Sequence, residues 1–350
     1  MRALVTGGAG FIGGHLSERL LADGHQVICL DDLSTGCYPN MAHLATWPGF
    51  EFVPGSVLDR PLIDDLAARS DTIFHLAAAV GVELIMSRTL DGLHTNIHGT
   101  EIVLDCALRH GRRTLVASTS EVYGKSATAT LREDQDRLVG SPLVRRWSYA
   151  EAKALDETLA YLFWSDRAVP TVIVRFFNVA GPRQTGRYGM VIPRFVDQAL
   201  RHRPLTVYSD GNQTRSFCHV RDAVAGLIAL IEHPGAYGGV FNIGRPEEVS
   251  IQQLAERVIK LSGSRSTIRH IPYREAYGDG FEDTLRRVPD ISRARALVGF
   301  QPRLDLDDII LSVIEDRLVR APPEPDRPVP VPVEPELALP PGGPDGEYVA

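Results

Sequence analysis

The glycine-rich segment at residues 4–13, which reads LVTGGAGFIG, constrains the fold of this chain more than any other feature. Gly7, Gly10 and Gly13 lie between a short apolar run and a stretch of helical spacing. Glycine at these positions permits a tight strand-to-helix turn, close approach of the backbone to a pyrophosphate, and close packing of the helix on the strand. The helix N-terminus then supplies amide donors and the positive end of its dipole. The segment therefore predicts a strand, a phosphate-binding turn and a helix.

Asp31 indicates which dinucleotide such a turn would hold. The apolar run at residues 26–30 ends in Asp31, eighteen residues after Gly13. A carboxylate at this point accepts hydrogen bonds from both ribose hydroxyls and repels a 2′-phosphate. We therefore predict NAD rather than NADP as the cofactor. The alternative is a structural glycine turn followed by a solvated acid.

Apolar runs and helical patterns alternate through the first half of the chain. The runs expected to form strands end at Val5, Leu30, Phe52, Phe74, Ala117 and Val174. Helical spacing occurs between them, for example at residues 11–22 and 93–109. This alternation predicts an α/β fold with a Rossmann-type doubly wound parallel sheet. Beyond Asn178 the pattern changes to loops, short strands and helices, which predicts a smaller α/β substrate-binding domain. The helices expected there cover residues 193–201, 221–232, 251–261 and 306–319.

We therefore expect an NAD-binding domain at residues 1–177, a substrate-binding domain at residues 178–320 and a tail at residues 321–350. Ten of the 24 prolines lie between Pro322 and Pro344. Six acids against one base give the tail a net charge of −5. Such a segment favours extended conformations and buries too little apolar surface to fold, so the tail is expected to be disordered.

Charge and cysteine patterns exclude several classes of function. The net charge of −7 leaves −2 for residues 1–320, which is not the clustered basic surface that nucleic-acid binding needs. No apolar run is long enough to span a membrane, and the chain starts directly in a strand pattern that leaves no room for a signal peptide. The four cysteines have no C-x-x-C spacing and the histidines are scattered. We therefore expect no metal site, no disulfide framework and a cytoplasmic location.

Two later segments carry residues suited to proton transfer. The sequence STSEVYG at residues 118–124 follows the fifth expected strand, at the sheet edge where ligands bind. Tyr149 and Lys153 open a helix expected to reach about residue 164, and their spacing places them on one helix face. A neighbouring ammonium and a cationic nicotinamide would lower the pKa of Tyr149 from about 10. Tyr149 is therefore a candidate general base, although Tyr-x-x-x-Lys also occurs on ordinary solvated helices.

Taken together, these motifs resemble the extended short-chain dehydrogenase/reductase family, in its nucleotide-sugar epimerase, dehydratase and decarboxylase group. The similarity covers roughly residues 1–318. The matching motifs are TGGAGFIG at 6–13, LDD at 30–32, HLAA at 75–78, STSEVYG at 118–124, YAEAK at 149–153, RFFNVAGPR at 175–183 and RSFCHVRD at 215–222.

The resemblance implies a reaction that passes through a 4-keto sugar. Tyr149 would take the proton of the sugar 4-hydroxyl while the C4 hydride passes to NAD, which is regenerated in each cycle and retained. Thr119 would hydrogen-bond the reacting oxygen, Ser120 is a candidate second contact, and Lys153 would also bind the nicotinamide ribose.

The resemblance also implies two sets of binding residues. Those expected to contact NAD are Gly7, Gly10, Phe11, Ile12, Gly13, Asp31, Asp32, Ser56, Val57, Leu76, Ala77, Ala78, Asn96, Tyr149 and Lys153. Those expected to contact a UDP-sugar are Val82, Thr119, Ser120, Asn178, Arg183, Arg187, Val191, Tyr208, Arg215 and Arg287. Ser56 departs from the family pattern, which places an Asp against the adenine.

The motifs divide over which reaction follows. Glu121, after Thr119 and Ser120, and the RRVPD sequence at residues 286–290 are similar to UDP-glucuronate decarboxylases. The sequence AAAVGV at residues 77–82 and GPRQ at residues 181–184 are similar to uronate epimerases. In the epimerase interpretation Arg183 or Arg187 would clamp the sugar carboxylate and suppress its loss. Glu121 is a further candidate catalytic residue, since a carboxylate near C5 could assist proton movement after C4 oxidation. The alternative for Glu121 is a residue turned away from the sugar and hydrogen-bonded to backbone.

We predict a UDP-glucuronate 4-epimerase, which would form UDP-galacturonate. The alternatives are a UDP-glucuronate decarboxylase that forms UDP-xylose or its 4-keto form, and another nucleotide-hexose 4-epimerase or 4,6-dehydratase. A non-catalytic NAD sensor on the same fold is a further alternative, which the intact set of Thr119, Tyr149 and Lys153 disfavours. Helices at residues 93–109 and 149–164 are the expected homodimer contacts, since members of the family commonly dimerise through two such helices.

Overall fold

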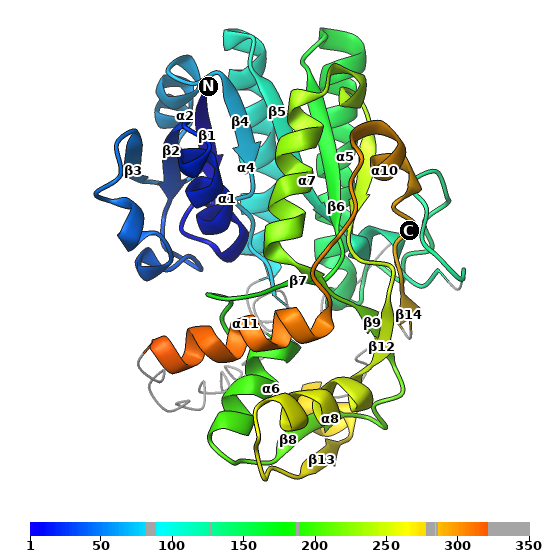
Figure 1. Ribbon diagram of the computed structural model, residues 1–350. Coiled ribbons are helices and arrows are strands. Elements are labelled where there is room, and N and C mark those ends of the chain that lie inside the picture. Colours follow the sequence, from blue (N-terminus) through cyan, green and yellow to red (C-terminus); the bar gives the residue numbers. More distant parts are fainter. Residues whose placement is uncertain (82–88, 127, 187–188, 278–283, 285, 321–350) are drawn as a thin grey trace, which may run out of the picture.

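The computed structural model describes residues 1–81, 89–126, 128–186, 189–277, 284 and 286–320. A seven-stranded sheet with the order β11-β6-β5-β4-β1-β2-β3 forms its centre, and every neighbouring pair of strands is parallel (Figure 1). The strands are β1 (Arg2–Thr6), β2 (Gln26–Asp31), β3 (Phe50–Pro54), β4 (Thr72–His75), β5 (Arg113–Thr119), β6 (Thr171–Phe176) and β11 (Val240–Ile243). The predicted doubly wound parallel sheet is thereby confirmed. The expected tail at residues 321–350 lies outside the described residues.

Alternation along the strands explains why helices cover both faces of the sheet. In β1, Ala3 and Val5 belong to one buried cluster and Leu4 to another, because successive side chains of a strand point to opposite faces. One face carries α1 (Phe11–Ala22), α7 (Val220–Glu232) and α10 (Ser292–Val298). The other face carries α2 (Arg60–Ala68), α4 (Thr89–His110) and α5 (Ser148–Arg167).

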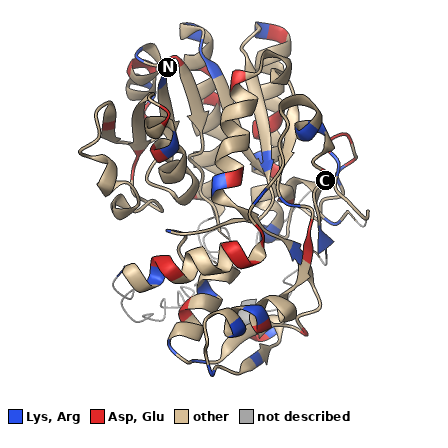
Figure 2. Cartoon of the chain, viewed as in Figure 1, with Lys and Arg blue, Asp and Glu red and all other residues tan. Residues whose placement is uncertain are grey.

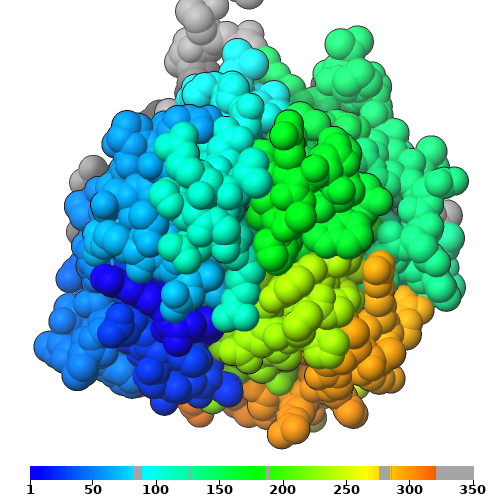
Figure 3. All heavy atoms as spheres, turned by 90° about the horizontal axis from the view of Figure 1, so that it is seen from above, coloured from blue at the N-terminus to red at the C-terminus, as the bar shows by residue number. Residues whose placement is uncertain are grey.

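The sheet takes its seventh strand from beyond the expected boundary at residue 177. β11 pairs with β6, and Phe241 and Ile243 of β11 lie in the same buried cluster as residues of α7 and α10. Seen from above, the yellow-green and orange segments pack directly beside the green ones (Figure 3). Sequence reasoning missed β11 because it is a four-residue run between glycines, too short to show a period.

The remaining elements form a smaller α/β body below the carboxyl ends of the sheet strands (Figure 1). Its strand pairs are β10 (Cys218–His219) with β7 (Val179–Ala180), β13 (Ile268–Ile271) with β8 (Leu205–Tyr208), and β9 (Thr214–Ser216) with both β12 (Glu248–Ser250) and β14 (Arg286–Arg287). Its helices are α6 (Val191–Leu200), α8 (Ile251–Leu261), α9 (Tyr273–Tyr277) and α11 (Leu306–Val319). Capping boxes begin α8 at Ser250 and α11 at Asp305, which fixes where these two helices start. This body has its own buried cluster, separate from that of the sheet.

Candidate active site

The glycine turn between β1 and α1 is closed too tightly to accept side chains. Gly7 has a φ of +71°, and its N–H donates to the Leu30 carbonyl over 2.8 Å. A Cβ on Gly13 would lie 2.2 Å from the Gly7 carbonyl oxygen, and one on Gly10 would lie 3.0 Å from it. Gly10 is the N-cap of α1 and offers no side chain to cover the first amides of the helix. The turn therefore fits a pyrophosphate bound at the helix N-terminus.

Asp31 closes the other side of this turn. It is the last residue of β2 and is buried; its Oδ2 accepts from the Ala9 N–H over 3.0 Å and its Oδ1 from the Leu33 N–H over 2.8 Å. Burial raises the pKa of Asp31 above its ordinary value. Each carboxylate oxygen has a second lone pair that can accept from a ribose hydroxyl. The neighbouring Asp32 is exposed, and its Oδ1 accepts from the Ser34 N–H.

The other residues expected to bind NAD shape the backbone around the turn. The N–H groups of Leu76 and Ala77 donate to the carbonyl and hydroxyl of Thr6. Ser56 accepts from the Leu58 N–H over 3.2 Å. Val57 is buried on Gly99 of α4, where a Cβ would come within 2.7 Å of a Val57 methyl group.

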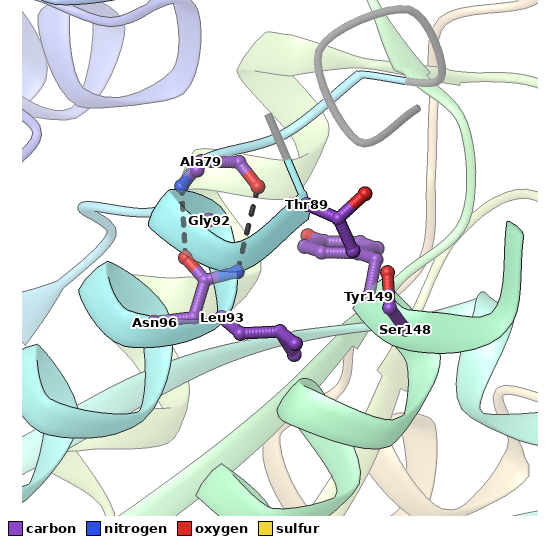
Figure 4. Close-up of a pocket in the computed structure, with 7 residues that line it drawn as sticks. All are labelled: Ala79, Thr89, Gly92, Leu93, Asn96, Ser148 and Tyr149. Carbon is purple, nitrogen blue, oxygen red and sulfur yellow. Dashed lines mark hydrogen bonds between the residues drawn. The ribbon is translucent and has the colours of Figure 1, made fainter. Parts of the chain in front are cut away.

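Asn96 holds the segment that follows β4. Its Oδ1 accepts from the Ala79 N–H over 2.8 Å and its Nδ2 donates to the Ala79 carbonyl over 3.4 Å (Figure 4). Thr89 and Tyr149 line the same small cavity from α4 and from the start of α5 (Figure 4). Asn96 thus places the segment after β4 beside the ring of Tyr149, with both ends of its amide engaged by Ala79.

The predicted catalytic residues converge at the end of β5. Thr119 is the last residue of β5, and its hydroxyl accepts from the Glu121 N–H over 3.2 Å. Ser120 is buried in the short turn that follows, which contacts α5. Tyr149 lies in the first turn of α5 and Lys153 in the second, and both are buried.

The electrostatics of Tyr149 differ from the expectation. The Lys153 Nζ donates to Asp156 Oδ2 over 3.0 Å, and both side chains are at most 1% exposed. Burial, followed by the carboxylates of Glu121 and Asp156, raises the pKa of Tyr149 above its ordinary value. The expected lowering of this pKa invoked a cationic nicotinamide as well as Lys153, and in the protein alone burial sets the opposite direction.

A second and larger cavity lies between the end of β5 and the smaller body. It brings together five of the residues expected to bind the substrate, namely Asn178, Val191, Tyr208, Arg215 and Arg287. Arg146 and Arg194 also line it, so among the described residues four arginines and one carboxylate, that of Glu121, line the cavity. Elsewhere the charges of both signs are mixed over the chain (Figure 2). A cavity with this excess of guanidinium groups suits a diphosphate.

Glu121 is held between two of these arginines. Its Oε2 accepts from Arg146 Nη1 over 2.5 Å and its Oε1 from Arg287 Nη1 over 3.5 Å. Burial alone would raise the pKa of Glu121, but the two guanidinium groups outweigh burial and hold the pKa below its ordinary value. Glu121 thus faces the cavity as a carboxylate paired with arginines, and it is not the residue turned away and bonded to backbone that the alternative for Glu121 expects.

Arg183 does not reach the cavity. Its Nη2 donates to Glu18 Oε2 over 2.5 Å and its Nη1 to the Asn40 carbonyl over 2.9 Å, so the side chain binds α1 and the segment after β2. Its φ is +67°, and its N–H is held by Asp316 of α11. The expectation that Arg183 clamps a sugar carboxylate is therefore corrected, because this turn directs the side chain toward the sheet domain. Two other residues predicted to contact the substrate, Val82 and Arg187, lie outside the described residues.

The turn, Asp31 and the Tyr149–Lys153 pair are the parts that a dinucleotide-dependent enzyme needs, and the sequence comparison decides the family. Residues 3–244 match the sequence model of the NAD dependent epimerase/dehydratase family. The chain belongs to this family. Membership confirms NAD as the cofactor, which family structures contain.

Relatives within the NAD dependent epimerase/dehydratase family include two decarboxylases. The UDP-N-acetyl-alpha-D-glucosaminuronate decarboxylase of Bacillus cytotoxicus is 40% identical over 90% of this chain and 97% of its own length. The UDP-glucuronic acid decarboxylase 1 of Danio rerio is 36% identical over 90% of this chain and 72% of its own length. The UDP-glucuronic acid 4-epimerase of Bacillus cereus, solved with UDP-glucuronic acid and NAD, has a TM-score of 0.81 and 29% identity over 90% of this chain and 98% of its own. The family is confirmed, and the 4-epimerase prediction is not.

Sequence reasoning missed two arginines of the family site. Arg146 lies three residues before Tyr149, and the signal for it was the acid Glu121, which needs a cation once it is buried. Arg194 lies over the ring of Tyr208 at 4.3 Å, and no spacing in the sequence links these two residues. In the part of the chain that the structure describes, no helix is long and apolar enough to cross a bilayer, and no three His, Cys, Asp or Glu side chains gather as metal ligands.

Proposed function

We propose that the protein is an NAD-dependent decarboxylase of a UDP-hexuronic acid. The observation that carries the proposal is the arrangement around the cavity: Glu121 faces it between Arg146 and Arg287, while Arg183 is bound to α1. One of the two arginines expected to restrain the sugar carboxylate is thus engaged elsewhere, and the other, Arg187, lies outside the described residues. The decarboxylase relatives, which align over 90% of the chain, support the same reaction.

In this proposal the residues at the end of β5 and the start of α5 act on C4 of the sugar. Bound NAD would supply the acceptor for the C4 hydride. Tyr149 takes the proton of the 4-hydroxyl, and the Thr119 hydroxyl hydrogen-bonds the same oxygen as it becomes a carbonyl. The product is a 4-keto sugar whose carboxylate is β to the ketone.

Loss of carbon dioxide then follows from the electrostatics of the cavity. The C5–C6 bond breaks, its electron pair passes into the enolate of the 4-ketone, and a proton adds at C5. Glu121 engages the guanidinium groups of Arg146 and Arg287. These arginines are therefore less able to clamp the substrate carboxylate, which can leave as neutral carbon dioxide.

Incubation of the protein with NAD and either UDP-glucuronate or UDP-N-acetylglucosaminuronate tests the proposal. The expected product is a UDP-pentose or its 4-keto form, seen by mass spectrometry as the loss of carbon dioxide and by proton NMR as a pair of protons at C5 in place of one. A product of unchanged mass with an inverted 4-hydroxyl would overturn the decarboxylase in favour of the 4-epimerase. Comparing the two substrates shows whether the sugar carries a hydroxyl or an acetamido group at C2.

A further inference from the structure

Asp156 is a buried acid on α5 that the proposed reaction does not use. It lies three residues after Lys153 and is fully buried, and its carboxylate accepts from the lysine ammonium over 3.0 Å. A buried ion pair gives little net stability, because desolvation of both charges offsets their attraction. The pair therefore calls for a role other than stability.

A hydrogen-bonded chain of uncharged groups fixes the surroundings of this pair. The Thr100 hydroxyl lies 2.8 Å from the Asn96 carbonyl oxygen and 3.1 Å from His75 Nε2, and it also hydrogen-bonds the Asp156 carboxylate. His75 Nδ1 lies 2.9 Å from the Thr6 hydroxyl. Burial, with a smaller effect of Lys153, lowers the pKa of His75 to about 3, so this histidine stays neutral.

The charged groups around Tyr149 and Lys153 can be assigned element by element. On α5 itself they are Asp156 and Glu157, and Glu157 is paired with Arg175 of β6 through two hydrogen bonds of 2.8 and 2.7 Å. The turn after β5 contributes Glu121, paired with Arg146 and Arg287. β4 contributes the neutral His75, and α4 contributes the uncharged Thr100. Among these acidic residues, Asp156 is the one that forms an ion pair with Lys153.

We propose that Asp156 is a positioning residue that fixes the Lys153 ammonium beneath the site and cancels its charge as felt by Tyr149. This inference rests on the proposed role of Tyr149 as the base. Burial, together with the carboxylates of Glu121 and Asp156, disfavours the phenolate of Tyr149 in the protein alone, so the base becomes active only when a further positive charge enters the site. The cationic ring of bound oxidised NAD provides such a charge, so Asp156 ties activation of the base to the oxidised cofactor.

The pH dependence of kcat for the UDP-hexuronate reaction tests this role. In Asp156→Asn, removal of the negative charge favours the phenolate, so the acid limb of the profile should move about one pH unit to lower pH. Asp156→Glu keeps the charge, so its limb should stay in place while kcat falls because the ammonium is displaced. Glu151→Gln is the matched control: Glu151 lies on the same helix between Tyr149 and Lys153, but it is exposed and pairs with Arg137, so its removal should not move the limb.

If the acid limb of the kcat profile of the folded Asp156→Asn variant coincides with that of the wild type, the proposal is overturned. It is also overturned if the Glu151→Gln variant shows an equal shift of the acid limb. A second experiment, which needs no substrate, compares the Tm of Lys153→Met, of Asp156→Asn and of the double variant. The loss in Tm of the double variant should differ strongly from the sum of the two single losses. Equality of the two would refute the pairing. A wild-type protein that binds NAD but converts no UDP-hexuronate would refute the proposed function instead, and the Tm comparison would still decide whether the two residues act as a unit.

Discussion

At the scale of single residues, the site depends on pairing buried charges. Glu121 and Arg146 are both largely removed from water, and each would be costly to bury alone. The pKa of Glu121 is below its ordinary value of 4.5, so the pair stabilises the fold fully above that value, and the stability is lost as the pH falls through the pKa of the folded protein.

Arg146→Leu should therefore lower the free energy of unfolding by about 3–5 kcal/mol at pH 7. The loss should shrink on acidification below the ordinary carboxyl pKa of 4.5, because Glu121 becomes protonated and then needs no cation. Urea titrations across this pH range measure the effect. The double variant Arg146→Leu/Glu121→Gln should recover part of the stability, and no recovery would contradict the pairing.

Glu121→Gln tests the same carboxylate in catalysis. The amide keeps the shape of the side chain but loses the charge that holds Arg146 and Arg287 away from the substrate carboxylate, so kcat should fall by about 10²-fold. Steady-state kinetics with the UDP-hexuronate measure it, and binding of NAD should be unchanged. An unaltered kcat would remove Glu121 from the reaction.

Sequence patterns identified some of these residues and missed others for a physical reason. Tyr149 and Lys153 could be paired because helical spacing sets their common face. Arg183 could not be placed, because its direction depends on a positive φ and on a hydrogen bond from its backbone to Asp316, more than a hundred residues away. Asp156 gave no signal, since a helical acid is usually solvated.

At the scale of elements, the junction of β1 and α1 controls how the cofactor is held. Gly13→Ala would place a Cβ 2.2 Å from the Gly7 carbonyl oxygen, and backbone cannot move aside as the end of a side chain can. We expect a loss of about 1–3 kcal/mol of stability and a strongly weakened NAD affinity, measured by thermal unfolding and by calorimetric titration.

Gly14→Ala is the control for this change. Its Cβ would lie 3.2 Å from the Asn40 carbonyl, so its effects on both measurements should be much smaller. Equal losses in the two variants would show that the turn is not specifically required.

The first six strands and α1, α8 and α11 were predictable because their apolar periods are regular, whereas two- and three-residue strands such as β7 and β9 exist only through their partners.

At the scale of the whole molecule, α4 and α5 present apolar side chains on the outer face of the sheet domain. Leu108 of α4 and Leu155 and Leu162 of α5 are each about two-fifths exposed, and the last two are seven residues apart on one helix face. We expect this face to form a homodimer.

The double variant Leu155→Arg/Leu162→Arg should be a monomer in sedimentation experiments at micromolar concentration. Leu318→Arg on α11, which changes a more exposed leucine, should leave the dimer intact, and an unchanged mass for the α5 variant would exclude this face.

The late arrival of β11 also has a consequence for how the chain is made. As the polypeptide leaves the ribosome, β6 is complete at residue 176, yet its neighbour is not synthesised until residue 243. For the whole of that interval β6 is an unpaired edge with open backbone donors and acceptors, which is the kind of surface on which nascent chains mispair. Termination after residue 177 would make that condition permanent, so a shortened dinucleotide-binding fragment should be recovered mainly as aggregate.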